Sequence, residues 1–360
     1  RSIWVTGVQT CALPIYRGQG LAMVAAAHDV LTRSLTPTAR FDVGDAPARD
    51  SFKAHLDDIE RHVDVGAVRA TINVRRHSLG KSDRERAYRT WCLTHRLFLS
   101  PLNDLGAVSI ASHDPLTLPA LTAPLSAEMP WVLGFFNQMK QEYVSARYLM
   151  YDGLHSDKVH FSDRAVTLVN TLDYPSFSLN VEKLRAAFRI AYSLLDKVGY
   201  FVNDYFALRH DPKRVSFRIV WFEPKGSPKP LHPRFAKSTN WVLRGLFWLS
   251  KDLFHDELKA STEPDAQALD AIRHHLEHKY LQVHENWAPG AAQLKDGLRE
   301  HSYSISRDDF ALKTLKLLKL ARAAMIYLSL AIHHEERQHP ESKGIVAPMH
   351  LDSWDDDWKR

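Results

Sequence analysis

The stretch "SLNVEKLRAAFRIAYSLLDKVGYFVNDYFAL" (residues 178–208) carries the clearest fold signal in this chain. Apolar side chains recur in it at three- and four-residue steps, and many of the positions between them are charged or polar. This spacing predicts a long amphipathic helix with one face in a core. The residues that trace the apolar face are Leu184, Phe188, Tyr192 or Ala191, Leu195, Val198 and Val202.

Helical patterns also lie on both sides of this stretch. Ser82 is a predicted N-cap with Glu85 three positions later, and Thr262 is a second predicted N-cap. Residues 68–82 are predicted to be a connector and residues 101–126 a long ordered loop, with no alternating strand pattern of any length and no fixed-period repeat. The sequence therefore predicts an all-α fold, with an up-and-down bundle from about residue 126. The other predicted helices are residues 20–35, 47–64, 82–99, 126–155, 241–254, 261–284 and 306–339.

Composition narrows the class of protein. The chain has 360 residues, of which 45% are hydrophobic and 25% charged, as in an ordinary globular protein. A net charge of +5 permits a polyanionic partner such as RNA, and 20 histidines suit proton transfer or metal binding. Two cysteines allow neither a disulfide framework nor a Cys-x-x-Cys metal site, which favours a reducing cytoplasm. No apolar run has the length of a bilayer span, so no membrane partner is expected.

The two ends of the chain are interpreted separately from its middle. "VTGVQTCALPI" (residues 5–15) resembles the in-frame translation of a common sequencing-library adapter, so residues 1–15 are expected to be an artefact. Residues 16–80 are expected to be an N-terminal helical segment, the remnant of a longer region. Residues 81–340 are the expected helical domain, with its bundle at about 126–340. Residues 341–360 are the expected acidic tail.

The segment "AIRHHLEHKY" (residues 271–280) holds the candidate site. Within the predicted helix 261–284, a core stripe runs through residues 269, 272, 276, 280 and 283. At about 100° per residue, Arg273 lies on the shoulder of that stripe and His278 nearly opposite it. His274 and His278 are one turn apart on a shared face, Glu277 lies between Arg273 and His278, and His275 is expected at the surface.

Three interpretations of this segment compete. The first is a solvated helix face, as for most charged helix positions. The second is a metal site, because His274 and His278 have the spacing of two helical ligands, although no third ligand is identified. The third is phosphodiester chemistry without metal, in which His278 transfers protons and Arg273 stabilises charge on the phosphorus centre.

Arg273-x-x-x-x-His278, late in a helix of an all-α domain, resembles the Arg-x(4–6)-His signature of the HEPN superfamily. The flanking segments are similar to a bacterial HEPN subfamily that is often preceded by tetratricopeptide repeats, and no such repeats are detected here. The resemblance extends from about residue 70 to 335. The segments that carry it are residues 88–106, 174–206, 243–254 and 273–285.

This resemblance implies a HEPN-like helical bundle with additional N-terminal helices, which pairs as a homodimer. It also implies an endoribonuclease that needs neither metal nor cofactor, with Arg273 and His278 of both copies meeting at one cleft and cutting RNA by 2′-OH attack. Glu277 and His274 are supporting candidates, and His274 stands where many catalytic members have a small polar residue, often asparagine. The implied setting is stress response, a toxin–antitoxin pair or anti-phage defence, with an antitoxin or regulatory partner.

Two alternatives remain open: a non-catalytic module that binds nucleotide, RNA or protein, and a histidine–metal hydrolase, which ranks last. Arg244, Lys251 and Asp252 are candidates to line the cleft or contact RNA, with a structural ion pair as the alternative. Four aromatic side chains nearby could stack on bases, but on helical segments a place in the core is favoured. These four are Trp241, Phe247, Trp248 and Phe254.

Overall fold

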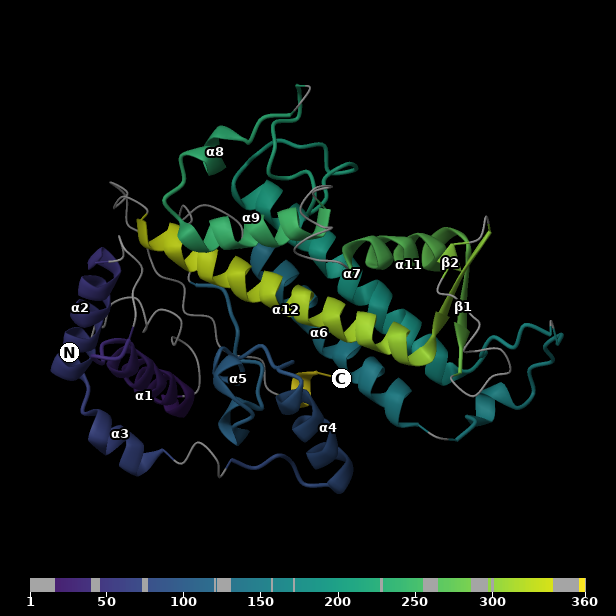
Figure 1. Ribbon diagram of the computed structural model, residues 1–360, viewed down its shortest axis with the longest axis horizontal. Helices are drawn as coiled ribbons and strands as arrows, with labels where there is room; N and C mark the ends of the chain where they lie inside the picture. The colour runs from purple at the N-terminus through teal and green to yellow at the C-terminus, as the bar shows by residue number, and fades with distance from the viewer. Residues whose placement is uncertain are drawn as a thin grey trace. The chain divides into compact units, whose positions relative to one another are not determined.

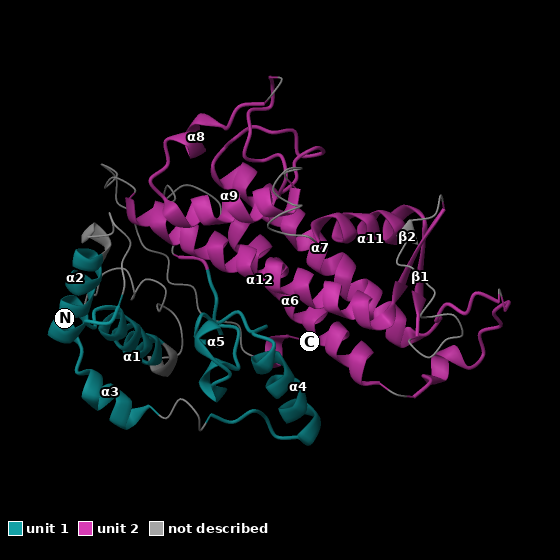
Figure 2. Ribbon diagram, in the orientation of Figure 1, with its two compact units in different colours: residues 1–117 teal, residues 118–360 magenta. Residues whose placement is uncertain are grey.

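The chain divides into two units, Arg1–Thr117 and Leu118–Arg360, which Figure 2 colours separately. Each unit is described by itself. The domain limits expected from the sequence, including the artefact at residues 1–15 and the acidic tail, stay predictions. The computed structural model describes residues 17–39, 46–72, 77–119, 121, 131–156, 158–170, 172–226, 229–254, 265–285, 297–298, 301–338 and 356–359.

Unit 1 is helical. Val24, Ile59 and Val65 form a small core among its first three helices. The predicted cap at Ser82 is present, since its hydroxyl accepts a hydrogen bond from the Glu85 N–H at 3.2 Å. Its helices are α1 (Arg17–Ser34), α2 (Ala46–His62), α3 (Val65–Thr71), α4 (Asp83–Thr94), α5 (Leu102–Leu105) and η1 (Ser109–Ala111).

Two stretches of unit 1 have more structure than the sequence predicted. The helix α3 takes in the start of the expected connector, because the Asp64 carboxylate accepts a hydrogen bond from the Ala67 N–H and caps the turn. The expected loop after residue 101 contains α5 and η1. There the buried Asn103 amide donates to the Leu93 carbonyl and accepts from the Phe98 N–H, which fixes the loop to α4.

Unit 2 is a bundle of long helices. The helices α6, α7 and α12 pack together, and α9 lies along α12 (Figure 1). Phe188 of α7 and Phe310 of α12 are fully buried, with ring centroids 5.8 Å apart, so the stripe predicted for residues 178–208 does face the core. The helices are α6 (Trp131–His155), η2 (Phe161–Asp163), α7 (Leu179–Tyr205), α8 (Pro233–Ala236), α9 (Trp241–Phe254), α11 (Ala266–His278), α12 (Arg307–Gln338) and η4 (Asp356–Trp358).

One part of unit 2 corrects the sequence prediction. The helix predicted to reach residue 284 ends at His278, and residues 280–284 form a strand, β1 (Tyr280–His284). This strand pairs in parallel with β3 (Ser302–Ser306), which also pairs antiparallel with β2 (Gly297–Leu298). Leu281 to His284 are all buried, so the strand belongs to the interior of the unit. Thr262, the other predicted N-cap, lies outside the described residues.

Helices still form the frame of both units, and the three short strands are an insertion between α11 and α12. The predicted all-α fold with additional N-terminal helices is therefore confirmed. Within the residues that the structure describes, none of the helices has the length and the apolar character that a bilayer span requires.

Candidate active site

The last turns of α11 hold the predicted site residues. Arg273, His274, Glu277 and His278 are exposed. His275 is not at the surface as predicted, because only 1% of it is exposed. Its Nδ1 lies 2.7 Å from the Ala271 carbonyl and its ring 5.7 Å from that of Tyr303 in β3. The sheet covers this side of α11, and no pattern in the sequence had predicted a sheet.

A cleft of about 260 Å³ lies between α7 and α11. Arg273, Glu277 and His278 all line it, although the helical phase had placed His278 nearly opposite the core stripe. The remaining wall comes from Leu276 of α11 and from residues of α7, none of which the sequence had indicated as a site residue. The α7 residues are Phe188, Arg189, Tyr192, Ser193 and Asp196.

Two side chains of α7 hold Arg273. Its guanidinium carbon lies 4.8 Å from the centre of the Tyr192 ring, and one of its nitrogens is 3.8 Å from an Asp196 carboxylate oxygen. The Arg273 side chain is 48% exposed, so it keeps donors available to a ligand in the cleft. A cation–π contact together with an ion pair restricts the rotamers of a long side chain before any ligand binds.

The environment of these partners is partly apolar. Burial, with the nearby Asp270 carboxylate, raises the pKa of the Tyr192 hydroxyl. Burial also raises the pKa of the Asp196 carboxyl, although the Arg273 charge and the Phe217 N–H act in the opposite direction. One side of the Arg273 guanidinium therefore faces partly buried groups, while 48% of the side chain stays exposed to water.

Arg189 joins the two helices of the cleft. One of its nitrogens donates to the Leu276 carbonyl at 2.7 Å, and another lies 3.3 Å from the Glu277 carboxylate. The last carbonyls of a helix have no intrahelical donor, so this arginine satisfies one of them near the end of α11. Glu277 is thus engaged with Arg189.

His278 is the last residue of α11, and Lys279 after it is extended. The His278 ring lies 5.5 Å from the His274 ring, centroid to centroid. In the described part of the chain no hydrogen bond is made to the His278 imidazole, so both ring nitrogens are open to a ligand or a second subunit. Among the described residues there is also no group of three or more His, Cys, Asp or Glu side chains placed to hold a metal ion.

Sequence reasoning missed the α7 partners because they lie about 80 residues before Arg273. A local signal was present: Arg189, Tyr192 or Ser193, and Asp196 recur at helical spacing along one side of the α7 core stripe. An ordinary solvated helix has the same polar stripe beside its core stripe. Only the tertiary contact between α7 and α11 distinguishes a wall of the cleft from a solvated helix face.

The α9 candidates lie elsewhere. Arg244, Lys251 and Asp252 are not among the residues that line the cleft. Arg244 donates to the Ser238 carbonyl at 2.8 Å, and the Lys251 ammonium is 5.9 Å from the centre of the Phe247 ring. Their predicted contact with RNA stays a prediction.

The aromatic side chains of α9 divide into two groups. Phe247 and Phe254 are partly buried against the loop that precedes the helix. Trp241 and Trp248, which were expected in the core, are 71% and 54% exposed. The expectation was wrong for these two because α9 buries one side only, the side that carries Leu243, Leu246 and Leu253 together with Val242.

A helical bundle with an arginine and a histidine five residues apart on one helix, both lining one cleft, has the features of a HEPN domain. The family model described as LA2681-like HEPN matches residues 125–335, so the chain belongs to this family. Comparison with curated proteins and with solved structures gave no match. The chain thus carries a module of the nucleotide- and RNA-related HEPN class.

Proposed function

We propose that this protein is a metal-independent endoribonuclease whose reaction centre is the α7–α11 cleft. The observation that carries the proposal is the pairing, in this one cleft, of Arg273 held by Tyr192 and Asp196 with a His278 whose ring is unconstrained. A positioned cation can stabilise the charge that develops on the phosphoryl oxygens, and an imidazole without hydrogen-bond partners can transfer protons.

The reaction follows from the roles of these two groups. His278 accepts the proton of a ribose 2′-OH, and the 2′-oxygen attacks the adjacent phosphorus. Arg273 stabilises the additional negative charge on the phosphoryl oxygens. The P–O5′ bond then breaks, and the 5′-oxygen takes a proton from a general acid. The products are a 2′,3′-cyclic phosphate and a 5′-OH.

A second copy of the chain is part of the proposal. If 2′-OH deprotonation and leaving-group protonation occur together, a neutral imidazole must act as the base and a protonated one as the acid, so a second His278 would serve as the general acid. The exposed positions of Arg273 and His278 support a cleft completed by a two-fold partner. We place this activity in the cytoplasm, in stress response, a toxin–antitoxin pair or anti-phage defence, where an antitoxin or regulatory partner would restrain it.

The first prediction tests the pair directly. In excess EDTA, the purified chain is expected to cut RNA and to leave cyclic phosphate ends. Arg273→Ala and His278→Ala are each expected to lower the cleavage rate at least about 100-fold, the contribution of a positioned general acid or base. Cleavage is measured on a labelled single-stranded RNA, with end-group analysis of the products.

The matched controls are Arg61→Ala and His334→Ala, which change the same residue types at positions that do not line the cleft and are expected to leave the rate unchanged. Cleavage that survives in both cleft variants would contradict the proposal. RNA or nucleotide binding without any cleavage by the wild-type protein would support the alternative, a non-catalytic binding module.

A further inference from the structure

Unit 2 also has a basic surface, formed by residues that do not line the α7–α11 cleft. Between residues 208 and 252 the sequence has ten Lys and Arg side chains against three Asp and Glu, although the net charge of the whole chain is only +5. Six of these basic side chains are exposed and have no ion-pair partner in the described part of the chain. The six are Arg209, Lys213, Arg218, Lys225, Lys229 and Lys237.

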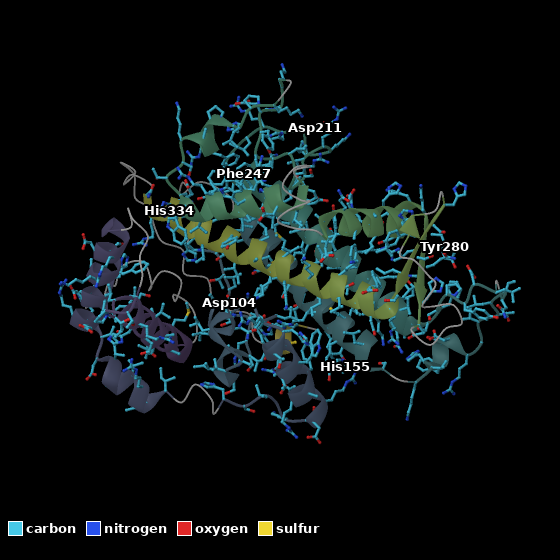
Figure 3. The ribbon with its side chains drawn as sticks, viewed as in Figure 1. Asp104, His155, Asp211, Phe247, Tyr280 and His334 are labelled. Atoms are coloured by element: carbon cyan, nitrogen blue, oxygen red, sulfur yellow. The ribbon has the colours of Figure 1, made fainter. Side chains whose placement is uncertain are left out.

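The segment that carries these charges has an ordered support. It folds onto one side of α9, where the buried Trp221 ring lies 5.6 Å from the Phe247 ring and 5.1 Å from the Phe235 ring. The Ser250 hydroxyl of α9 donates to the Phe217 carbonyl at 2.8 Å. Asp211 and Phe247 mark this part of unit 2 in Figure 3. Because the aromatic side chains fill the inside, the basic ones are left on the outside.

The same helix presents two exposed tryptophans. Trp241 and Trp248 are seven residues apart in α9, so they share a face and lie about 10 Å apart along the helix axis. Arg244 is exposed between them. Exposed indole rings interleaved with basic groups are the side chains on which unpaired bases stack while the phosphates are neutralised.

We propose that the outer face of α9, with the basic side chains of residues 209–226 and 229–237, is a second binding surface that holds single-stranded RNA outside the α7–α11 cleft. We refer to it as the α9 surface. The excess of unpaired positive charge favours a polyanion over a protein partner, and the two indoles favour an unpaired strand over a duplex, whose bases are stacked internally. The inference rests on the proposed function only in taking RNA as the ligand.

The test is binding of a fluorescent 20-nucleotide 2′-O-methyl oligouridine, which has no 2′-OH and cannot be cut. The double variant Trp241→Ala/Trp248→Ala is expected to bind it at least about 25-fold more weakly, the product of a loss of about five-fold or more at each of two stacking platforms. Lys213→Glu/Arg218→Glu is expected to weaken binding and to reduce the slope of log K against log salt by about 1.4, the value for two phosphate contacts.

Matched controls keep the result interpretable. Phe161→Ala removes another exposed ring, and Lys53→Glu/Arg61→Glu makes the same charge change in unit 1; both are expected to bind like wild type. Unchanged binding by both α9-surface variants would overturn the inference. So would a loss of dimer mass in the tryptophan variant without any loss of RNA binding, which would assign the surface to contacts between copies.

Failure of the proposed function gives a different result. A wild-type chain that binds the 2′-O-methyl strand through the α9 surface but does not cut a 2′-OH strand leaves this inference standing and removes the nuclease.

Discussion

Asp196 has two opposite effects at the residue scale. Its carboxylate lies near the Arg273 guanidinium, which positions the proposed phosphate contact. The same carboxylate is partly buried, and burial raises its pKa. A raised folded-state pKa means that the folded chain holds the proton to higher pH than the unfolded chain. Ionisation of Asp196 therefore costs stability as the pH rises through this range.

The second prediction follows from that sign. Asp196→Asn keeps the shape of the side chain and an acceptor for the Phe217 N–H, but removes the charge. At pH 7 we expect the free energy of unfolding to stay the same or to rise by less than about 1 kcal/mol, since the site is partly solvated. Any gain should disappear as the pH falls below the usual pKa of an aspartate. Urea unfolding at pH 7 and at pH 3.5 measures it.

The same substitution is expected to lower the cleavage rate about tenfold, because Arg273 loses a positioning partner. A variant that is both as active and as stable as the wild type would mean that Tyr192 alone holds the arginine. Tyr192→Phe is the matched control. It keeps the ring beneath the guanidinium and is expected to retain activity.

Arg273 and His278 could be selected from the sequence because a motif and an angular position around a helix both depend only on residues close together in the chain. The prediction that His275 lies at the surface was wrong, because its angular position alone does not show whether another element covers it. His275 is buried against Tyr303 of β3, which lies about 30 residues further along the chain. Helical periodicity indicates which residues share a face, whereas the tertiary partner decides which faces are covered.

At the scale of the element, the end of α11 is the informative case. Residues 276, 280 and 283 fit a helical stripe, whereas residues 281 and 283 fit an alternating strand equally well. The pairing of β1 with β3 decides between the two patterns, and this partner is not adjacent in sequence. Two α7 arginines add to the break, since Arg189 bonds the Leu276 carbonyl and Arg185 bonds the Leu281 carbonyl at 2.8 Å.

The third prediction concerns this connection. Arg189→Met keeps much of the side-chain volume but removes the donor to Leu276 and the ion pair with Glu277. We expect a loss of about 1 to 2 kcal/mol in the free energy of unfolding, at the low end for a hydrogen bond that involves a charged group, because the Arg189 side chain is 42% exposed. We also expect faster amide exchange in the last turn of α11. Denaturant unfolding and hydrogen exchange measure the two effects.

Arg214→Met is the control for that experiment. The Arg214 side chain is 86% exposed, so water screens its ion pair with Asp211 and a change below about 0.5 kcal/mol is expected. If Arg189→Met unfolds like this control and the exchange of α11 is unchanged, the arginine does not hold the helix end.

At the scale of the whole molecule, the long helices could be predicted from the sequence and the sheet could not. The residues 241–254 form a helix with the predicted limits, and the last long helix differs from its prediction by one residue at each end. Long periodic segments are determined by their own residues. Two five-residue strands have few residues from which to read a period, and each depends on a partner elsewhere in the chain.

The last prediction concerns the independence of unit 2. The family match at residues 125–335 lies within it, and so do both helices of the cleft. Side chains from three of its helices meet in its core, and at most 2% of Phe136, Phe188 or Phe310 is exposed. A chain of the length of unit 2 buries enough surface to fold alone.

Residues 118–360 are therefore expected to unfold in one cooperative urea transition and to cut RNA at the rate of the full chain. A broad transition without near-UV circular dichroism would instead mean that unit 1 completes the core. The control is the same fragment with His278→Ala, which is expected to unfold at the same urea concentration but not to cut.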